Sequence, residues 1–489
     1  MTEERTSTDN PEYGKMTDEA VERLRSRLGR VYKIEQPYLR HVNQDSITHV
    51  ARALGDTNPL YLDPEYARGT RYGKMIAQPA FCYGVAWGSW DLRRGQGLPG
   101  VHGLHSGDTW HYYRPFYEGD VVHAEKELVT CEFRQGRQAS RMLYQADEIR
   151  FYNQHNELVA KQYMPMFRFE RTDSKKTGKN AKVAKAVYTA EEIAQIDREL
   201  ESETPRGSKP RYWEDVQIGE QLDPVVKGPL TVPDMIAWLQ GVGSPHVRSG
   251  KHWLEYRKRS PRVAVVDPAT GIPQAVERVH WDEYMAAEIG MPTAYDYGSQ
   301  RGGYATYFAT LWAGDDGWVA SLEVQYRGMV FLGDVYRIRG RVVDKWRGAK
   351  TGTGYVKAEI SSINQRNENV MPGSYDVHLP IRDFSVPTDT FRVEMAVRDT
   401  LRAAIRGKPV YVGCMGGWGR TGLFLALLAK AAGVDDPVAY VRKHYTPRAV
   451  ETRAQEQFVK DFDVTKLRKW LHKFAWAQRF PWLSRFLAP

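Results

Sequence analysis

The order of apolar and polar positions along the chain predicts strands that follow helices, and this order occurs twice. Runs rich in β-branched and aromatic residues, with the alternation typical of half-buried strands, cover 121–133, 141–152, 319–326, 335–343 and 355–363. Each group follows a helix-like segment and then an apolar segment rich in Gly and Ala; these segments are 45–54 with 75–90, and 232–240 with 298–313. Helices followed by an antiparallel sheet indicate an α+β fold.

Short motifs show that the two groups are copies of one unit. The motifs that return are Asp63 as Asp282, Gly119-Asp120-Val121 as Gly333-Asp334-Val335, and 153–157 as 364–368. The spacing between copies drifts only from 219 (282 − 63) to 211 residues (364 − 153), so a unit of about 170 residues occurs twice. Because a single sheet of this kind exposes an edge, we expect the two sheets to join side by side. A pseudo-two-fold would then relate Gly119 to Gly333 and Asp63 to Asp282.

After Pro380 the pattern changes. Residues 388–406 and 421–432 have helical patterns, and between them 409–412 reads as a short apolar strand that leads into a Gly-rich turn. Strand, turn and helix in this order are typical of a parallel α/β unit, which predicts a third module from about 381 to 462. The tail from Lys466 is basic and aromatic, which favours an amphipathic helix that packs on its own protein or lies on a membrane surface.

Composition narrows the classes of protein. The 489 residues suggest about three domains, and 42% hydrophobic with 26% charged residues is a globular composition. The sequence has no run of 18 apolar residues, so no membrane helix is predicted. Its first residues lack the basic segment followed by an apolar segment that marks a secretory signal. Three cysteines cannot form a disulfide framework, so we expect a cytoplasmic protein. The net charge of +9 is compatible with anionic small ligands and does not by itself indicate nucleic acid. No His, Cys or Asp spacing suggests a metal site.

A polar turn in the first unit carries the first candidate chemistry. The stretch Gly55-Asp56-Thr57-Asn58-Pro59 is a helix end followed by a tight turn, where Asp and Asn either cap backbone groups or supply a general base and its polar partner. Over about residues 30–380 the chain resembles the MaoC-like, (R)-specific enoyl-CoA hydratase family of hotdog proteins. The resemblance implies a double hotdog fold, two antiparallel sheets each around a central helix. It also implies that an Asp and a His activate water at an acyl-thioester double bond.

Neither unit holds the complete pair of that family. Tyr61 stands at the His position of the first unit; in the second, His280 is present but Ala275 stands at the Asp position and Glu277 at the Asn position. Three alternatives stay open: Asp56 acts alone, Glu277 replaces the acid and pairs with His280, or two separate half-sites share the work. Asn58 is a candidate substrate-binding residue.

The most specific pattern lies in the third module. Val410-Tyr411-Val412 leads to Cys414, and glycines at 416, 417, 419 and 422 allow backbone N–H groups to converge on an anion at the start of a helix. Such a field lowers the pKa of a thiol and favours a nucleophilic thiolate at Cys414. Arg420 has the planar fork that holds two phosphate oxygens, and Thr421 can steady the sulfur.

This pattern resembles the cysteine-dependent protein tyrosine and dual-specificity phosphatases, whose loop is Cys, five residues, Arg, then Ser or Thr. The resemblance implies Asp383 as the general acid, Gln455 as the residue that positions water, and Gly416, Gly417 and Gly419 as binders of the phosphate. Two features depart from the family. Gly413 replaces the usual His, and the strands that normally precede the acid loop have no counterpart except 375–380, which also reads as the last strand of the second unit.

The predicted organisation has five parts. They are a first hotdog domain (1–172), a Lys-rich linker with a helix (173–210), a second hotdog domain (211–380), a small α/β phosphatase-like module (381–465) and the basic aromatic tail (466–489).

The predicted function is an acyl-thioester hydratase or dehydratase of fatty acid metabolism, carrying a phosphatase-like module. Its substrate would arrive on CoA or acyl carrier protein, with no other cofactor. One alternative is a phosphomonoester phosphatase acting through Cys414, with the hotdog pair as a binding or homodimerising scaffold. Another is a non-catalytic acyl-thioester binding protein.

Overall fold

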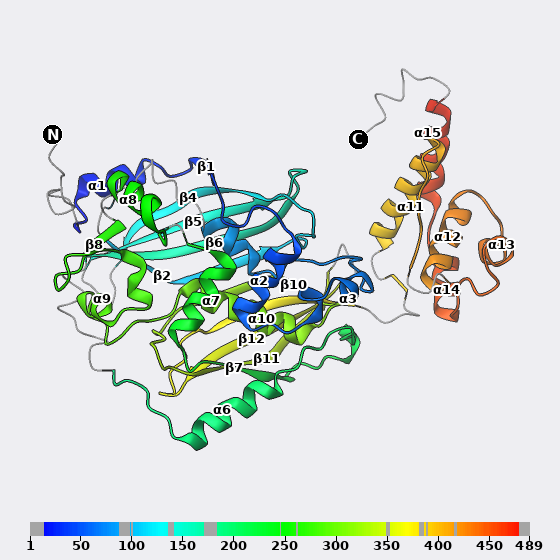
Figure 1. Cartoon of the computed structure of the whole chain (residues 1–489). Coiled ribbons are helices and arrows are strands. Elements are labelled where there is room, and N and C mark those ends of the chain that lie inside the picture. The colour runs from blue at the N-terminus through cyan, green and yellow to red at the C-terminus, as the bar shows by residue number, and fades with distance from the viewer. Residues whose placement is uncertain are drawn as a thin grey trace. The chain divides into compact units, whose positions relative to one another are not determined.

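The computed structural model describes two compact units of the chain (Figure 1). The described residues are 14–87, 98, 101–134, 141–170, 183–244, 246–260, 263–348, 353–380, 386–387, 390–414 and 418–478. The first unit comprises residues 1–211, 217–344 and 356–378, and the second comprises 212–216, 345–355 and 379–489. Both predicted hotdog halves thus fall largely within the first unit.

Eleven strands of the described chain form one sheet, in the order β1-β4-β5-β6-β3-β10-β13-β12-β11-β7, with β2 also paired to β6. Their bounds are β1 Val31–Lys33, β2 His102–His105, β3 Gly107–Tyr112, β4 His123–Arg134, β5 Met142–Tyr152, β6 Leu158–Phe169, β7 Gln221–Lys227, β10 Trp318–Gln325, β11 Tyr336–Arg347, β12 Gly354–Asn364 and β13 Gly373–Leu379. A small separate ribbon pairs β8 (Ala264–Val266) with β9 (Pro273–Ala275). The strands expected from the alternating pattern are therefore confirmed.

The two halves join edge to edge through β3 and β10. These strands are antiparallel, with Asp108 opposite Val324 and Trp110 opposite Leu322. The pairing gives hydrogen-bond partners to the backbone N–H and C=O groups that the edge strand of a single half would leave exposed. The predicted side-by-side arrangement of two similar sheets is confirmed.

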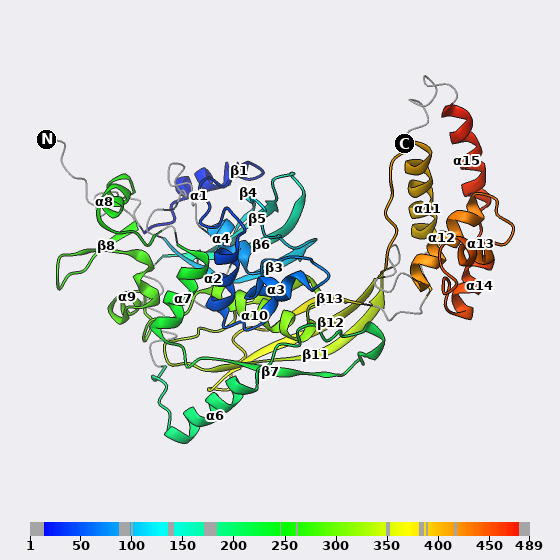
Figure 2. The same ribbon diagram turned by 45° about the vertical axis from the view of Figure 1, so that its right-hand side comes forward.

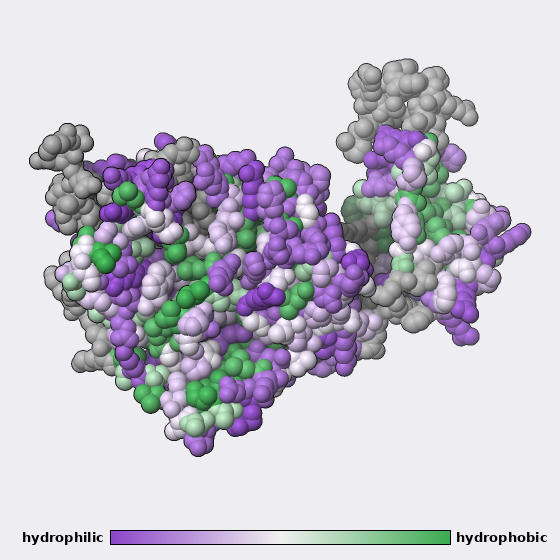
Figure 3. Space-filling view, in the orientation of Figure 1, coloured by the Kyte–Doolittle hydropathy of each residue, from purple (hydrophilic) through white to green (hydrophobic). Residues whose placement is uncertain are grey.

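The helices described in this unit are α1 Asp18–Arg25, α2 Gln44–Leu54, α3 Pro64–Arg68, α4 Phe81–Trp87, α6 Ala190–Ser202, α7 Val232–Val242, α8 Gly250–Arg259, α9 Glu283–Glu288 and α10 Gly298–Ala313. Of these, α4, α6 and α10 contact strands of the sheet. In two views β4, β5 and β6 of the first half lie above α2 and α10, and β11 and β7 of the second half lie below them (Figures 1 and 2). Polar side chains cover most of the face seen in Figure 3, and apolar ones gather over α7, where Ile236 is 51% exposed.

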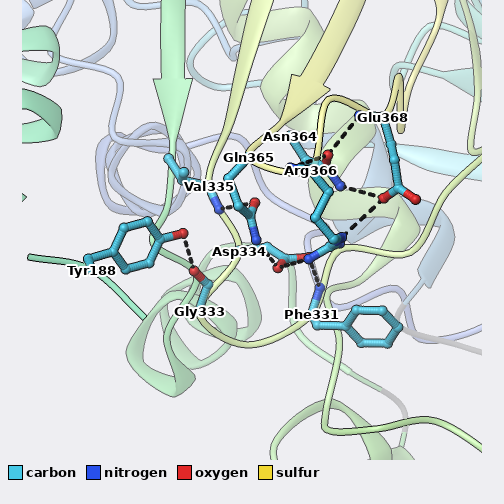
Figure 4. A network of polar contacts seen from close by, with 9 residues as sticks. All are labelled: Tyr188, Phe331, Gly333, Asp334, Val335, Asn364, Gln365, Arg366 and Glu368. Atoms are coloured by element: carbon cyan, nitrogen blue, oxygen red, sulfur yellow. Dashed lines mark hydrogen bonds and ion pairs between the residues drawn. The ribbon is translucent and has the colours of Figure 1, made fainter. Parts of the chain in front are cut away.

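Equivalent turns confirm the repeat at the level of single hydrogen bonds. Asn153 and Asn364 each accept two backbone N–H groups through Oδ1, and each donates Nδ2 to a Glu four residues later at 2.8 Å. Asn156 and Asn367, inside these turns, have φ of 58° and 61°. In the second half, Asp334 accepts from the Phe331 N–H and from Arg366, which ties the turn to the entry of β11 (Figure 4).

The C-terminal unit is helical over the residues that the structure describes beyond Pro380. Its helices are α11 Thr390–Ile405, α12 Gly419–Ala431, α13 Pro437–His444, α14 Arg453–Asp461 and α15 Thr465–Gln478. They share a core that includes Val397, Leu427 and Val459. The strand expected at 409–412 is not formed: these residues pair with no described strand, and Tyr411 is 94% exposed.

The strand β13 belongs to the hotdog sheet. It pairs with β10, with Trp318 opposite His378 and Leu322 opposite Tyr375. This pairing assigns 375–379 to the second half and leaves the phosphatase-like module without that strand.

The linker helix α6 packs on the second half, where Ile196 is buried with Val226 and Val335. Lys175, Lys176, Lys179 and Lys182 of the predicted Lys-rich linker lie outside the described residues, as do Trp482 and Arg485 of the tail. In the described part of the chain, no helix has both the length and the apolar character that crossing a membrane would require.

The close contact of α2 with α7 gives a test of the paired architecture. A Cβ on Gly241 would lie 2.7 Å from the Ala53 Cβ and 3.1 Å from the His49 carbonyl oxygen. Gly241→Val should therefore lower the free energy of unfolding by about 1–3 kcal/mol, because the helices must separate. Urea denaturation measures the effect, and exposed Gln240→Ala on the same helix is the control. Equal stability of Gly241→Val and wild type would contradict this contact.

Candidate functional site

A cavity of about 750 Å³ in the hotdog pair holds the candidate residues of the second half. His280 ends the 3-10 turn Val276–His280 and lines this cavity. Its Nδ1 donates to the Tyr295 carbonyl oxygen at 2.8 Å, and its ring stacks on Tyr297 at a centroid distance of 3.8 Å. Burial lowers the pKa of His280 to about 4. The ring is therefore neutral near pH 7, with its lone pair on Nε2.

Glu277 lines the same cavity and is held by other partners. Its Oε1 accepts from the Tyr297 hydroxyl at 2.8 Å, and its Oε2 accepts from the Ser244 hydroxyl. Burial raises the pKa of Glu277. Both Glu277 and His280 thus contact Tyr297, and the direct hydrogen bond that one of the three alternatives requires between them is not formed.

The first turn of α10 faces the cavity. Tyr297 and Gly298 line it, and no side chain caps the start of this 16-residue helix. The first N–H groups of a helix have no partner within the helix, and they carry partial positive charge. The two halves have equivalent β-bridges, Ile76 with Tyr117 in the first half and Tyr295 with Phe331 in the second. Three residues after Ile76 stands Pro79, and three residues after Tyr295 stands Gly298. Proline has no N–H to offer, which distinguishes the two halves.

Asp56 occupies a different place. It is buried, is not among the residues that line the cavity, and its Oδ1 accepts from the Asn58 N–H at 2.9 Å. Burial raises the pKa of Asp56 to about 7, although the Asn58 N–H and Lys227 oppose that rise. Asn58 itself donates Nδ2 to Asp315 at 2.9 Å and caps the next turn. The structure therefore does not bring Asp56 and His280 into one site.

Lys227 supports the Asp56 turn from the second half. Its Nζ donates to the Leu54 carbonyl oxygen at 3.3 Å, lies 3.8 Å from Glu203 and sits 4.2 Å from the ring centroid of Tyr307. Burial lowers the pKa of Lys227, while Glu203 and Asp56 oppose that shift. These contacts hold the turn at the end of α2 against the second half.

Sequence reasoning missed a second group on the cavity wall. Asp108, His105 and Tyr326 line the cavity, and Asp108 binds His105 at 3.0 Å and Tyr326 at 2.6 Å. His105 and Asp108 belong to the first half and Tyr326 to the second, 218 residues beyond Asp108. Only the short His-x-x-Asp spacing at a strand entry was visible in the sequence, and that spacing is common.

In the C-terminal unit, the structure gathers part of the predicted phosphate loop. α12 begins at Gly419, so Arg420 and Thr421 lie in its first turn. A Cβ on Gly419 would lie 3.1 Å from the Gln455 Nε2, which places Gln455 against the loop. The Thr421 hydroxyl and the Gln455 amide nitrogen are buried and have no partner among the described residues. Cys414 is partly exposed.

Three predicted residues of this site, Asp383, Gly416 and Gly417, lie outside the described residues. Nor does any group of three or more His, Cys, Asp or Glu within the described chain form a metal site.

Two family models match the chain. Residues 29–162 match the FAS1-like dehydratase domain region, and residues 365–461 match the DSP-PTPase phosphatase domain of Swiss Army Knife proteins. The second match begins before β13, the strand that the hotdog sheet uses.

Solved structures and curated relatives resemble parts of the chain. A solved MaoC-like dehydratase superposes with a TM-score of 0.51 at 17% identity, covering 73% of this chain and all of that one, which shows the fold. An uncharacterized protein of Methanocaldococcus jannaschii is 40% identical over 86 residues, 18% of this chain. The chain spans only 58%, 57% and 63% of the first three curated relatives.

Fold and matches define a double hotdog protein of MaoC-like dehydratase architecture, whose residues 365–461 match the model of a DSP-PTPase domain. A UPF0336 protein of Cutibacterium acnes is 31% identical over 116 residues, which are 22% of this chain and 70% of that protein. The chain belongs to the UPF0336 family.

Because the Asp56 carboxyl is buried, we expect its removal to raise the free energy of unfolding by an amount that depends on pH. Its pKa rises from 3.8 in the unfolded chain to about 7, which corresponds to roughly 4 kcal/mol against folding once both states are ionised. This cost is absent below pH 3.8 and grows until about pH 7. Asp56→Asn keeps an oxygen for the Asn58 N–H, so its gain in unfolding free energy over wild type should increase by about 2–3 kcal/mol between pH 5 and pH 8. Urea denaturation across this range measures it. Exposed Asp45→Asn is the control, and a gain that does not change with pH would contradict the buried charge.

Proposed function

We propose that the hotdog pair is an acyl-thioester hydratase or dehydratase of the enoyl-CoA type, working in the cavity at His280. The observation that carries this proposal is the meeting, in one cavity, of a neutral buried histidine with the open start of α10. The fold of MaoC-like dehydratases supports it.

The cavity holds groups that this reaction would use. The thioester carbonyl would accept from the N–H groups at the start of α10, which stabilise the negative charge that develops on its oxygen. His280 Nε2 would accept a hydrogen bond from the attacking water. Glu277 and Tyr297 hold this histidine in place through the stacked ring.

The carrier of the acyl chain would be CoA or acyl carrier protein. Two exposed arginines, Arg134 and Arg327, line the cavity. Guanidinium groups suit the phosphates that both carriers bear on their pantetheine arm. No further cofactor is needed, because water addition to an enoyl thioester exchanges no electrons with the protein.

The two halves can be told apart by single substitutions. His280→Ala should lower kcat for hydration of crotonyl-CoA or longer enoyl-CoAs by about 10²- to 10⁴-fold, because the water loses its partner. Asp56→Asn, assayed in parallel, should change kcat much less. The larger loss marks the half that does the chemistry. If wild type binds acyl-CoA without turning over any enoyl-CoA, acyl binding is the better account.

We infer a second activity, phosphomonoester hydrolysis, for the C-terminal unit. Its support is the matched DSP-PTPase domain together with two unpartnered buried donors, Thr421 and Gln455, near the start of α12. The Cys414 thiolate would attack phosphorus while Arg420 binds two oxygens. Asp383 would protonate the leaving alcohol, with Gly416, Gly417 and Gly419 around the phosphate. Water positioned by Gln455 would then release phosphate from the cysteine.

Cys414→Ser tests this activity with para-nitrophenyl phosphate. Turnover should fall to background while phosphate still binds, because a serine hydroxyl is not ionised at neutral pH. Arg420→Lys should lower kcat by about 10²-fold or more, since an ammonium cannot form the bidentate fork. Exposed Arg453→Lys on α14 is the matched control. Wild-type protein without phosphatase activity would end the proposal.

A further inference from the structure

The pair His105 and Asp108 stands on the cavity wall without a role in the chemistry described so far. Their side chains are 8% and 0% exposed, and the His105 Nε2 lies 3.0 Å from the Asp108 Oδ1. Both residues come from the first half, at the end of β2 and the start of β3. The second half, whose turn supplies His280, has Ala275 five residues before this histidine.

Asp108 is held by four donors. Oδ1 accepts from His105 and from Gln162 at 2.7 Å, and Oδ2 accepts from the hydroxyls of Tyr83 at 2.7 Å and Tyr326 at 2.6 Å. Four accepted hydrogen bonds suit a carboxylate without a proton. His105 must then donate from Nε2, so a ring that holds a single proton carries its lone pair on Nδ1.

The Nδ1 atom of His105 lies close to the start of α10. It would lie 3.1 Å from a Cβ on Gly298, and it is buried with no hydrogen-bond partner among the described residues. The Tyr326 ring meets the His105 ring edge to face at 5.1 Å and fixes its plane. The unpartnered Nδ1 therefore lies beside the first turn of α10, where the thioester carbonyl would bind.

We propose that His105, oriented by Asp108, is the general base of the His280 cavity, so that the first half completes the site of the second. The inference rests on the proposed hydratase function. His280 suits the base poorly, because a ring with a pKa of about 4 takes up little proton at pH 7.

The step balances without any other reactant. His105 Nδ1 takes a proton from water, and the water oxygen bonds to C3 of the enoyl chain. The π pair of C2 and C3 moves onto the thioester as an enolate, whose oxygen the α10 N–H groups hold. The imidazolium then returns its proton to C2, which restores neutral His105 and leaves the 3-hydroxyacyl thioester.

His105→Gln tests the base directly. Its kcat for enoyl-CoA hydration should fall by about 10²- to 10⁴-fold with KM nearly unchanged, because binding groups stay in place. The matched control is His111→Gln, an exposed histidine of the same strand β3. Added imidazole should restore part of the activity of His105→Ala, a rescue that a purely structural role would not produce.

Asp108→Asn tests the positioning residue. The amide can donate to Nε2 and so move the ring proton to Nδ1, which removes the lone pair from the cavity side. Its kcat loss should match that of His105→Gln, and the double variant should lose no more than either single one. Circular dichroism melting shows whether Asp108→Asn still folds; if it unfolds, the His105 variants decide alone.

The outcomes separate this inference from the proposed function. An active wild type whose His105→Gln keeps more than a tenth of kcat overturns the base assignment and leaves the hydratase intact. Absence of any imidazole rescue also overturns it. A wild type that hydrates no enoyl thioester overturns both.

Discussion

The antiparallel pairing of β3 with β10 is the contact on which the hotdog pair depends. It closes the edge of each half, and each of its backbone hydrogen bonds contributes about 1 kcal/mol net. Its register places Asp108 opposite Val324, two residues before Tyr326. The same pairing therefore brings a carboxylate of the first half to the hydroxyl of the second half and builds one wall of the cavity.

The two halves of the shared sheet differ in the candidate residues that they contain. The first half keeps an acid at Asp56, which is buried among side chains from both halves and lies away from the cavity. The second half has the histidine and the open helix start, with Gly298 where the first half has Pro79. Because a proline offers no N–H, the start of α10 presents an N–H group that the first half lacks at this position.

The hotdog sheet uses a strand, β13, that the phosphatase-like module would otherwise have available. β13 lies between β10 and β12 in the hotdog sheet, although the phosphatase domain match already starts at residue 365. A strand has two edges, and both edges of β13 are taken. The module therefore rests on packed helices, with Leu427 and Val459 in its core and Gln455 against Gly419.

The sequence predicted the strands, the repeated unit and the candidate phosphate loop, because strand alternation, repeated motifs and the Cys-x5-Arg pattern are local features. The motifs repeated at Asn153 and Asn364 fold into equivalent turns, and the helix predicted after the Cys414 loop is formed. Tertiary structure alone decided the rest. Residues 409–412 form no strand, because an apolar run becomes a strand only beside a partner. Glu277 accepts hydrogen bonds from Ser244 and Tyr297 and forms none with His280. The Asp108 network joins residues up to 218 positions apart, and no local pattern encodes which distant donors a buried carboxylate will meet.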